Sequence, residues 1–316
     1  MKISMVIPCY NEEGNVIPIC NALKEMFAKD LPKYEYEIIL IDNKSKDKTR
    51  ERIRSLCEND SCIKAIFNIK NFGQFNSPFY GLLQSSGDCT IHFCADFQDP
   101  VEMIPIMVRE WEKGHKVISM IKTSSKENKV MYFLRSIYYK LIKKMSTENQ
   151  IEHFTGFGLY DKSFIEILRN LNDPIPFLRG LVAEYAPDHL EIKYEQQLRK
   201  AGRSSNNFFS LYDAAMLSFT SYTKGGLRIA TFFGFTVSLI SFLIAIVYLI
   251  LKIMFWNDFI AGNIPILMGV FFFGGLQLFF IGLLGEYIIS MNTRIMDRPL
   301  VIEEERINFK ENKENN

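Results

Sequence analysis

The sequence predicts an α/β protein with a doubly wound, mainly parallel sheet, and two observations lead to this class. Short apolar segments alternate with amphipathic segments up to residue 121, which is the pattern of strands joined by helices. Polar residues follow the apolar segments, and parallel sheets bind their ligands at the carboxyl ends of the strands. The polar residues are therefore expected to converge on one crevice.

The elements can be placed in order along the chain. Strands are expected at Lys2–Pro8, Tyr36–Asp42, Ile63–Ile69, Thr90–Cys94 and Lys116–Ile121. Helices are expected at Asn15–Ala28, at a segment ending near Cys57, at Asn76–Ser86 and at Glu102–Lys113. Ser45 and Asp47 are natural caps for the second of these helices.

Composition excludes some classes of protein. The chain has 316 residues and a formal net charge of +1, so it has no overall attraction to nucleic acid. All six cysteines lie in the first third, and they are interpreted as buried thiols rather than disulfides or zinc ligands. The first residues turn polar too soon for a secretory signal.

Two uncharged stretches predict a membrane hairpin. Ile229–Leu251 has 23 residues and Phe259–Gly285 has 27, and as helices both exceed the hydrocarbon core of about 30 Å. Positive charge is concentrated outside the hairpin, at Lys224, Arg228, Arg294 and Arg298. The positive-inside rule then places the N-terminal domain and both termini in the cytoplasm, on a multi-pass protein of the inner (cytoplasmic) membrane.

These observations divide the chain into four parts. They are a cytosolic domain at 1–205, an interfacial amphipathic region at 206–228, two transmembrane helices at 229–290 and a cytoplasmic tail at 291–316. An apolar stripe within 129–145 fits a core helix or a helix on an anionic membrane surface equally well. The tail after Glu303 is polar and is expected to be disordered.

The stretch Phe93–Pro100 is the centre of the predicted site. Asp96, Gln98 and Asp99 follow an apolar strand, and two carboxylates with an amide can hold Mg²⁺ or Mn²⁺ through oxygen. The alternative is an acidic cap on the next helix. The glycine-rich motifs of dinucleotide dehydrogenases and of P-loop proteins are both absent from the sequence.

Six motifs in order resemble glycosyltransferase family 2, and within it the polyprenyl-phosphate glycosyltransferases. They are Val6–Glu13, Ile41–Thr49, Lys70–Gly73, Ala95–Pro100, Thr155–Gly158 and Arg179–Gly180. The resemblance runs from residue 3 to about residue 290. It implies a GT-A fold that transfers a sugar from a nucleotide sugar to a polyprenyl phosphate with inversion, for synthesis or modification of a cell-envelope glycan.

The resemblance also implies roles for particular residues. The metal ligands would be Asp96 and Gln98, and Asp99 lies beside them as a third catalytic candidate. Pro8, Tyr10, Glu12, Asp42 and Asp96 match positions that bind the nucleotide sugar, and Asn11 and Asn68 join them at the same strand ends. Candidates for the lipid phosphate are Lys122, Arg135, Arg179, Arg199, Lys200, Arg203 and Ser204.

Some residues depart from the family pattern. Cys94 stands where the first acid of an Asp-x-Asp pair is usual, which leaves the number of metal ligands open, and Asn43 stands where many relatives have a second acid. Gly158 and Lys122 each replace a frequent Arg. The basic segment after Gln197 also fits a juxtamembrane cluster whose cations reach the lipid headgroups.

Two other functions remain in view. A processive polysaccharide synthase would normally need more membrane spans and a Gln-x-x-Arg-Trp motif, but Arg199 is followed by Lys200. An inactive membrane-anchored nucleotide-binding scaffold should have lost its ligands, yet Asp42, Asp96 and Gln98 remain. A UDP-linked donor is expected and GDP-mannose is less favoured, while the sugar and a homo-oligomeric state are left open.

Overall fold

The computed structural model describes residues 1–123, 151–171, 173–197, 225–254, 263–296 and 298–309, with isolated residues between 212 and 220. Eight strands form one sheet in the order β7-β5-β6-β4-β1-β2-β3-β8. They are β1 (Lys2–Cys9), β2 (Glu35–Asp42), β3 (Ile63–Asn68), β4 (Cys89–His92), β5 (Val117–Lys122), β6 (Phe154–Asp161), β7 (Leu190–Tyr194) and β8 (Glu303–Ile307). All five strands predicted from the sequence are present.

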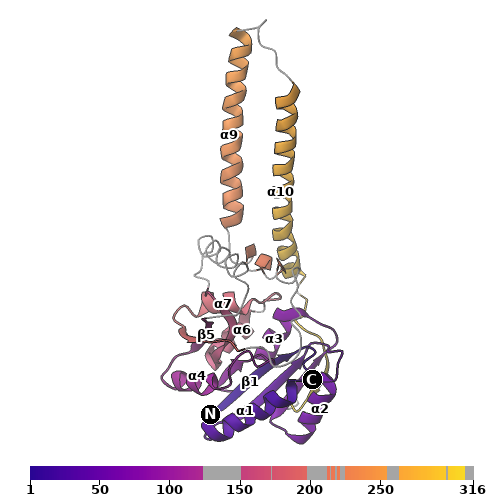
Figure 1. Ribbon diagram of the computed structural model, residues 1–316, viewed down its shortest axis with the longest axis vertical. Coiled ribbons are helices and arrows are strands. Elements are labelled where there is room, and N and C mark those ends of the chain that lie inside the picture. Colours follow the sequence, from indigo (N-terminus) through magenta and orange to yellow (C-terminus); the bar gives the residue numbers. More distant parts are fainter. Residues whose placement is uncertain are drawn as a thin grey trace.

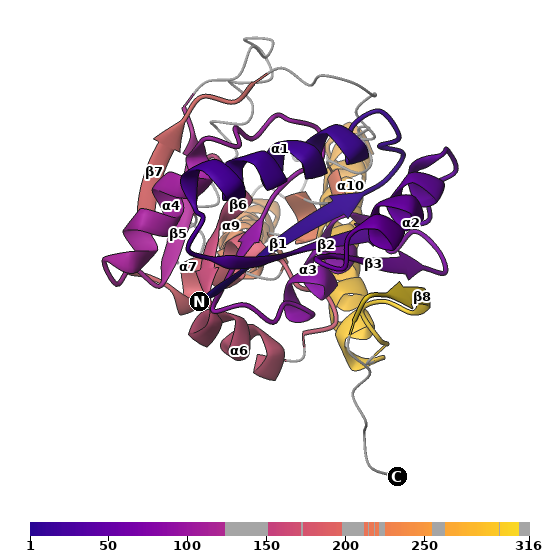
Figure 2. The same cartoon turned by 90° about the horizontal axis from the view of Figure 1, so that it is seen from below.

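Helices cover both faces of this sheet. They are α1 (Val16–Asp30), α2 (Thr49–Asn59), α3 (Gly73–Leu83), α4 (Met103–Glu112), α6 (Lys162–Leu171) and α7 (Leu178–Tyr185). Alternate residues of β1 face opposite layers: Met5 and Ile7 pack in the cluster with α1, α2 and α4, whereas Val6 packs in the cluster with α3, α6 and α7. Figure 2 shows α1 and α6 on opposite sides of the sheet. The doubly wound class is therefore confirmed.

The sheet is mixed because two strands run against the others. β1 pairs in parallel with β2 and β4, β2 with β3, and β5 with β7. β6 lies antiparallel between β4 and β5, so it separates two strands that follow one another among the predicted strands of the chain. A Cβ atom at Gly158 on β6 would collide with the carbonyl oxygen of Ile118, so this position accepts only glycine at the observed strand spacing. This explains why Gly158 can depart from the family pattern.

The expectation that the chain after Glu303 is disordered was wrong for residues 303–307. These residues form β8, which pairs antiparallel with β3 at one edge of the sheet (Figure 2). Every second side chain of β8 is partly buried, and Asn308 donates from Nδ2 to the carbonyl oxygens of Cys57 and Ile63, both at 2.8 Å. The C-terminal segment is thus part of the α/β unit.

Two long helices project from the α/β unit (Figure 1). α9 (Gly225–Met254) has 30 residues and α10 (Asn263–Ile295) has 33, so at about 1.5 Å per residue each is longer than a hydrocarbon core. The ring centroids of Phe233 and Phe280 lie 6.4 Å apart, which places the helices side by side. In the described part of the chain, one stretch, Phe272–Ile295, is long and apolar enough to cross a membrane. A second span within α9 stays a prediction.

Contacts join these helices to the rest of the chain. Arg294 at the end of α10 pairs with Asp173 at 2.8 Å, and Tyr212 donates to Glu286 at 3.0 Å. The interpretation of all six cysteines as buried thiols was wrong for Cys62, which is exposed, and for Cys94, which is partly exposed. The six cysteines are free, as expected.

Glu37 is a buried carboxylate at the amino end of the sheet. Its oxygens accept from Lys2 Nζ (2.7 Å), Lys64 Nζ (2.6 Å), Ser4 Oγ (2.6 Å) and the Ser86 N–H (2.7 Å). Burial alone would raise the pKa of Glu37, but these donors lower it to about 2. The carboxylate therefore ties three strands and the turn before β4 together.

We expect Glu37→Gln to lower the free energy of unfolding by about 3 kcal/mol, because Lys64 would keep a largely buried charge without its partner. The pKa of Glu37 is depressed in the folded state, so its contribution is present above the usual carboxyl range near 4.5 and is lost as the pH falls toward 2. Denaturant unfolding at pH 7 and pH 3 measures both effects. The exposed Glu25→Gln is the control, and a loss below about 1 kcal/mol at pH 7 would contradict this role.

Candidate active site

The residues predicted to bind the metal and the nucleotide lie at or just after the carboxyl ends of four neighbouring strands. Cys9 at the end of β1 pairs with Asp42 at the end of β2, which in turn pairs with Phe67 near the end of β3. On the other side of β1, Val6 pairs with His92 at the end of β4. The polar segments that follow these strands therefore begin along one edge of the sheet, as the sequence predicts.

The loops after β1 and β2 are joined by hydrogen bonds. The Asn11 N–H donates to Ser45 Oγ (2.9 Å), the Lys46 N–H donates to Asn11 Oδ1 (2.8 Å), and the Glu12 N–H donates to Thr49 Oγ1 (2.8 Å). Asn11 has a φ of 56°, a left-handed conformation that asparagine tolerates better than most residues. The Asn11 side chain thus supports the loop after β2, and a direct contact of Asn11 with a nucleotide stays a prediction.

Asp42 is fully buried at the centre of this edge. Its carboxylate accepts from the backbone N–H groups of Lys44 (3.1 Å) and Ser45 (3.2 Å), and Arg50 Nε lies 3.4 Å from Asp42 Oδ2. Burial raises the pKa of Asp42, while the hydrogen bonds from Ser45 and the charge of Arg50 oppose that rise. A carboxylate with two oxygens can accept more bonds than these, so Asp42 is suited to receive a further N–H group.

Asn43 holds the loop after β3. Its Nδ2 donates to Asn71 Oδ1 (2.9 Å), and its Oδ1 accepts from the Phe72 N–H (2.8 Å) and from Asn68 Nδ2 (3.2 Å). Asn68 also donates to Ser77 Oγ (3.0 Å) and is fully buried. An amide can donate and accept at once, which a second carboxylate at position 43 could not do. Asn68 therefore supports Asn43 from the protein interior, and its contact with the nucleotide stays a prediction.

The loop after β4 carries the predicted metal ligands. Asp96 is buried, with 6% of its surface exposed, and Asp96 Oδ1 accepts from the Gln98 N–H at 3.1 Å. Phe97 between them has a left-handed φ of 58°, so the backbone turns tightly from Asp96 to Gln98. The oxygen donors of Asp96, Gln98 and Asp99 have the chemistry that Mg²⁺ or Mn²⁺ prefers.

These oxygen donors fit a divalent cation only as part of its ligand shell. Within the described ranges, no group of three or more His, Cys, Asp or Glu side chains could hold a metal ion by itself. Mg²⁺ usually keeps several waters and is bound through one or two carboxylates together with phosphate oxygens of a substrate. The residue types after β4 match that kind of shared site, in which phosphate oxygens of a substrate would complete the coordination.

Asp99 is held by a buried side-chain partner, Tyr194. Asp99 has 2% of its surface exposed and accepts a hydrogen bond of 2.7 Å from the hydroxyl of Tyr194, at the end of β7. Burial raises the pKa of Asp99 to about 6, against the opposing effect of the Tyr194 hydroxyl. The Gln197 N–H also donates to the Gln98 carbonyl oxygen at 3.0 Å. Hydrogen bonds from Tyr194 and Gln197 thus connect the end of β7 to the predicted metal loop.

The predicted cations for a lipid phosphate are only partly within the described ranges. Arg179 at the start of α7 donates to the Phe154 carbonyl oxygen (3.4 Å) and stacks on the ring of Phe177, with 5.0 Å from Cζ to the centroid. Lys122 is the last residue of β5, and its N–H donates to the His153 carbonyl oxygen at 3.3 Å. Arg135, Arg199, Lys200, Arg203 and Ser204 lie outside the described residues.

Among the predicted nucleotide residues, Pro8 is partly buried within β1, and Tyr10 and Glu12 follow directly and are also partly buried. Sequence reasoning missed Tyr194 and Glu304, whose side chains reach the predicted site from β7 and β8. The sequence gives little sign of these two residues, because their partners at the site are far away along the chain and no periodic pattern links them. The one available indication of Tyr194 was its place five residues before Arg199, the first residue of the basic motif.

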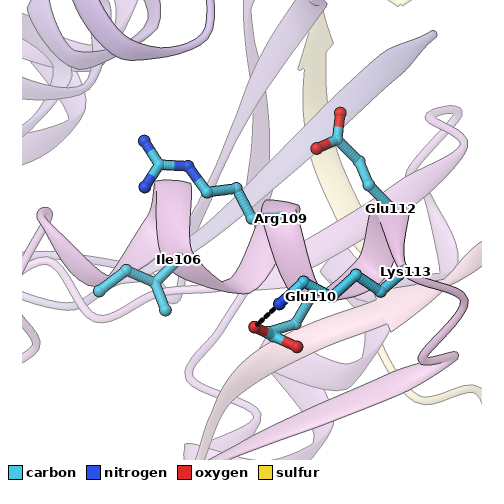
Figure 3. Close-up of a pocket in the computed structure, with 5 residues that line it drawn as sticks. All are labelled: Ile106, Arg109, Glu110, Glu112 and Lys113. Carbon is cyan, nitrogen blue, oxygen red and sulfur yellow. Dashed lines mark hydrogen bonds and ion pairs between the residues drawn. The ribbon is translucent and has the colours of Figure 1, made fainter.

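A shallow hollow lies along α4, lined by Ile106, Arg109, Glu110, Glu112 and Lys113 (Figure 3). Lys113 Nζ pairs with Glu110 Oε1 at 2.7 Å across this surface, and the side chains carry charges of both signs. All five residues belong to α4 or the residue after it, so none follows the carboxyl end of a strand. The hollow is therefore separate from the candidate active site.

The chain is similar in sequence to known glycosyltransferases. The sequence profile described as Glycosyl transferase family 2 matches residues 4–168. The chain is 32% identical over 303 residues to the SfII prophage-derived bactoprenol glucosyl transferase of Shigella flexneri, covering 96% of this chain and 97% of that protein. The prophage bactoprenol glucosyl transferase homolog of Escherichia coli K12 is 30% identical, with 96% and 98% covered. The protein belongs to glycosyltransferase family 2, and it is a glycosyltransferase.

Solved structures are also similar to this chain. The crystal structure of glucosyl-3-phosphoglycerate synthase from Mycobacterium tuberculosis in complex with Mn²⁺, uridine diphosphate and phosphoglyceric acid matches with a TM-score of 0.48 and 15% identity, over 69% of this chain and 76% of that one. The crystal structure of residues 1–349 of TarS from S. aureus matches with a TM-score of 0.44 and 15% identity, over 70% and 66%.

Proposed function

We propose that this protein transfers a single sugar from a nucleotide sugar, with UDP as the expected carrier, to a membrane polyprenyl phosphate with inversion at the anomeric carbon. The observation that carries the proposal is that Asp42 ends β2 and the Asp96–Asp99 loop follows β4, and these two strands flank β1 in parallel, so both segments start at one edge of the sheet. Relatives that match almost the full length of the chain are named for glucosyl transfer to bactoprenol, a bacterial polyprenol. A product of this kind serves the synthesis or modification of cell-envelope glycans.

Different residues of this chain bind different parts of the donor. Asp42 accepts an N–H group of the nucleobase, and the loop after β1 packs beside it. Asp96 and Gln98 hold Mg²⁺ or Mn²⁺, which supplies positive charge to the departing diphosphate. Asp99, held by Tyr194, fixes the course of the metal loop. The bond that breaks joins the anomeric carbon to a diphosphate oxygen.

The acceptor supplies its own nucleophile in this mechanism. A phosphate monoester has a second pKa of about 6, so it is mostly dianionic at pH 7 and needs no general base. One phosphate oxygen bonds to the anomeric carbon on the face opposite the leaving diphosphate, which inverts the configuration there. Cations position the acceptor, and the candidates are Lys122, Arg135, Arg179, Arg199, Lys200 and Arg203, with the hydroxyl of Ser204.

The direct test is a panel of labelled nucleotide sugars. Membranes from cells expressing the full chain are incubated with each donor, and the lipid is then extracted. We expect label in the lipid fraction from one donor, dependent on Mg²⁺ or Mn²⁺ and released as sugar phosphate by cleavage of the lipid. Label in a long polymer would favour a processive synthase, and nucleotide binding without any transfer would favour an inactive scaffold.

We further propose that α9 and α10 form a membrane hairpin with the catalytic domain and both termini in the cytoplasm. The positive charges outside the hairpin support this orientation. We expect an impermeant thiol reagent outside intact cells to label a cysteine at Asn257 and to leave one at Asn312 unlabelled. Labelling at residue 312 from outside would contradict the orientation and the cytoplasmic donor site together.

A further inference from the structure

The C-terminal strand carries a glutamate that reaches the loop after β2. The β3–β8 ladder shifts register between Phe67 and Asn68, and Glu304 has no paired residue on β3. Such a bulge turns a side chain away from its regular direction, and bulges are common beside active sites. Glu304 Oε2 accepts from Lys44 Nζ at 2.7 Å and from Arg50 Nη2 at 2.9 Å.

Both residues whose side chains pair with Glu304 also contact Asp42, Lys44 through its backbone N–H and Arg50 through its guanidinium. The Lys44 N–H donates to Asp42 Oδ2 at 3.1 Å, and Lys44 has a left-handed φ of 63°. Arg50 lies over the ring of Phe67 and brings its Nε to 3.4 Å from Asp42 Oδ2, yet this Nε makes no hydrogen bond to any described residue. Arg50 is therefore shared between two carboxylates, and Glu304 has the better geometry.

We propose that Glu304 is a positioning residue for recognition of the donor's nucleobase. By drawing the Arg50 guanidinium to itself, Glu304 keeps Arg50 from pairing fully with Asp42, and by binding Lys44 it fixes the turn that surrounds Asp42. Asp42 then keeps an oxygen available to accept an N–H group of the base. This inference rests on the proposed function, in which Asp42 meets the base. It makes β8, which follows the long helix α10, part of the donor site.

The test compares two ligands that differ only by the nucleoside. Calorimetric titration of the full-length protein in detergent with Mn²⁺ gives dissociation constants for UDP and for inorganic pyrophosphate, before and after Glu304→Gln. We expect the dissociation constant for UDP to rise about threefold to tenfold, the range for two partly exposed ion pairs. Pyrophosphate uses the metal loop alone, so its dissociation constant should change by less than about twofold.

Two further variants separate positioning from a general effect of charge. Glu305→Gln removes the same charge from the neighbouring residue of β8, whose partner is Arg54 at 2.7 Å, and it should leave the affinity for UDP within about twofold. If Glu304 acts through Arg50 alone, adding Glu304→Gln to an Arg50→Gln variant should cause little further loss of affinity for UDP. The remaining effect of the double variant measures the part carried by Lys44.

The outcomes are distinct. An unchanged affinity for UDP in Glu304→Gln, or an equal loss for UDP and pyrophosphate, would overturn the inference and leave the proposed function standing. A wild-type protein that binds pyrophosphate but neither UDP nor GDP would overturn base recognition at Asp42 and the proposed function with it. A matching loss in Glu305→Gln would show that β8 acts through its charge alone, which also overturns the inference.

Discussion

Asp96→Asn is expected to reduce sugar transfer by about 100-fold or more while the protein stays folded. In the proposed mechanism the substitution removes a negative charge that holds the cation beside the donor diphosphate, and losing one such electrostatic contact in a water-excluded site typically costs a factor of 10² to 10³. The amide keeps the size of the side chain, and its Oδ1 can still accept from the Gln98 N–H. The measurement is the initial rate of label transfer to lipid at saturating donor and Mn²⁺.

Asp88→Asn is the matched control for this prediction. Asp88 lies just before β4, at the opposite end of the strand from the site, and accepts from the Lys2 N–H at 2.8 Å. Its activity should stay within about twofold of the wild type, because it is far from the transferred sugar. Wild-type turnover in Asp96→Asn, or full wild-type activity in excess EDTA, would remove the metal from the mechanism.

The sequence predicts the first five strands well because each is an apolar run between helices with their own period. It fails for β8, where three successive glutamates resemble a solvated tail. Two of these glutamates pair with cations outside the strand, which favours its place at the sheet edge: Arg54 binds Glu305 at 2.7 Å, and Glu304 binds Lys44 and Arg50. Composition alone cannot show such partners, since they are distant in the sequence.

Some residues of the candidate site could be predicted from the sequence, and others could not. Asp42 and Asp96 could be predicted because the carboxyl ends of parallel strands share one edge, so a local sequence signal has a known place in the fold. The hydrogen bond between Tyr194 and Asp99 joins residues 95 positions apart, and no periodic pattern reports it. The role of Asn43 could not be predicted from the sequence either. It stands where an acid is usual, but its Oδ1 accepts from Asn68 and Phe72, which only the fold brings together.

Asp99→Asn is expected to make the metal-free protein more stable and less active. The folded-state pKa of Asp99 is about 6 against an ordinary 3.8, so its ionised form is disfavoured in the fold. Above pH 6 the ionised carboxylate therefore lowers stability by up to about 3 kcal/mol relative to a neutral group. The asparagine Oδ1 can still accept from the Tyr194 hydroxyl, so the neutral side chain should recover about 1 to 2 kcal/mol of this.

The sign of this effect gives Asp99 a recognisable pH dependence. The folded state takes up the proton first, so the wild type gains stability relative to Asp99→Asn as the pH falls through 6 toward 4, and the two proteins should converge there. Thermal unfolding in EDTA at pH 8 and pH 5 measures the difference. Turnover at pH 7.5 should fall at least about tenfold, because a buried negative charge beside Asp96 strengthens the binding of a divalent cation.

Ligand binding separates this electrostatic role from mere packing. Addition of Mn²⁺ with UDP should raise the unfolding temperature of the wild type more than that of Asp99→Asn, because the cation compensates the buried carboxylate only where one is present. Tyr194→Phe is the complementary variant: it leaves the carboxylate in place without its hydroxyl donor, and it should be less stable than the wild type at pH 8. A stability difference between wild type and Asp99→Asn that is the same at pH 5 and pH 8 would show that the charge of Asp99 has no part in the site.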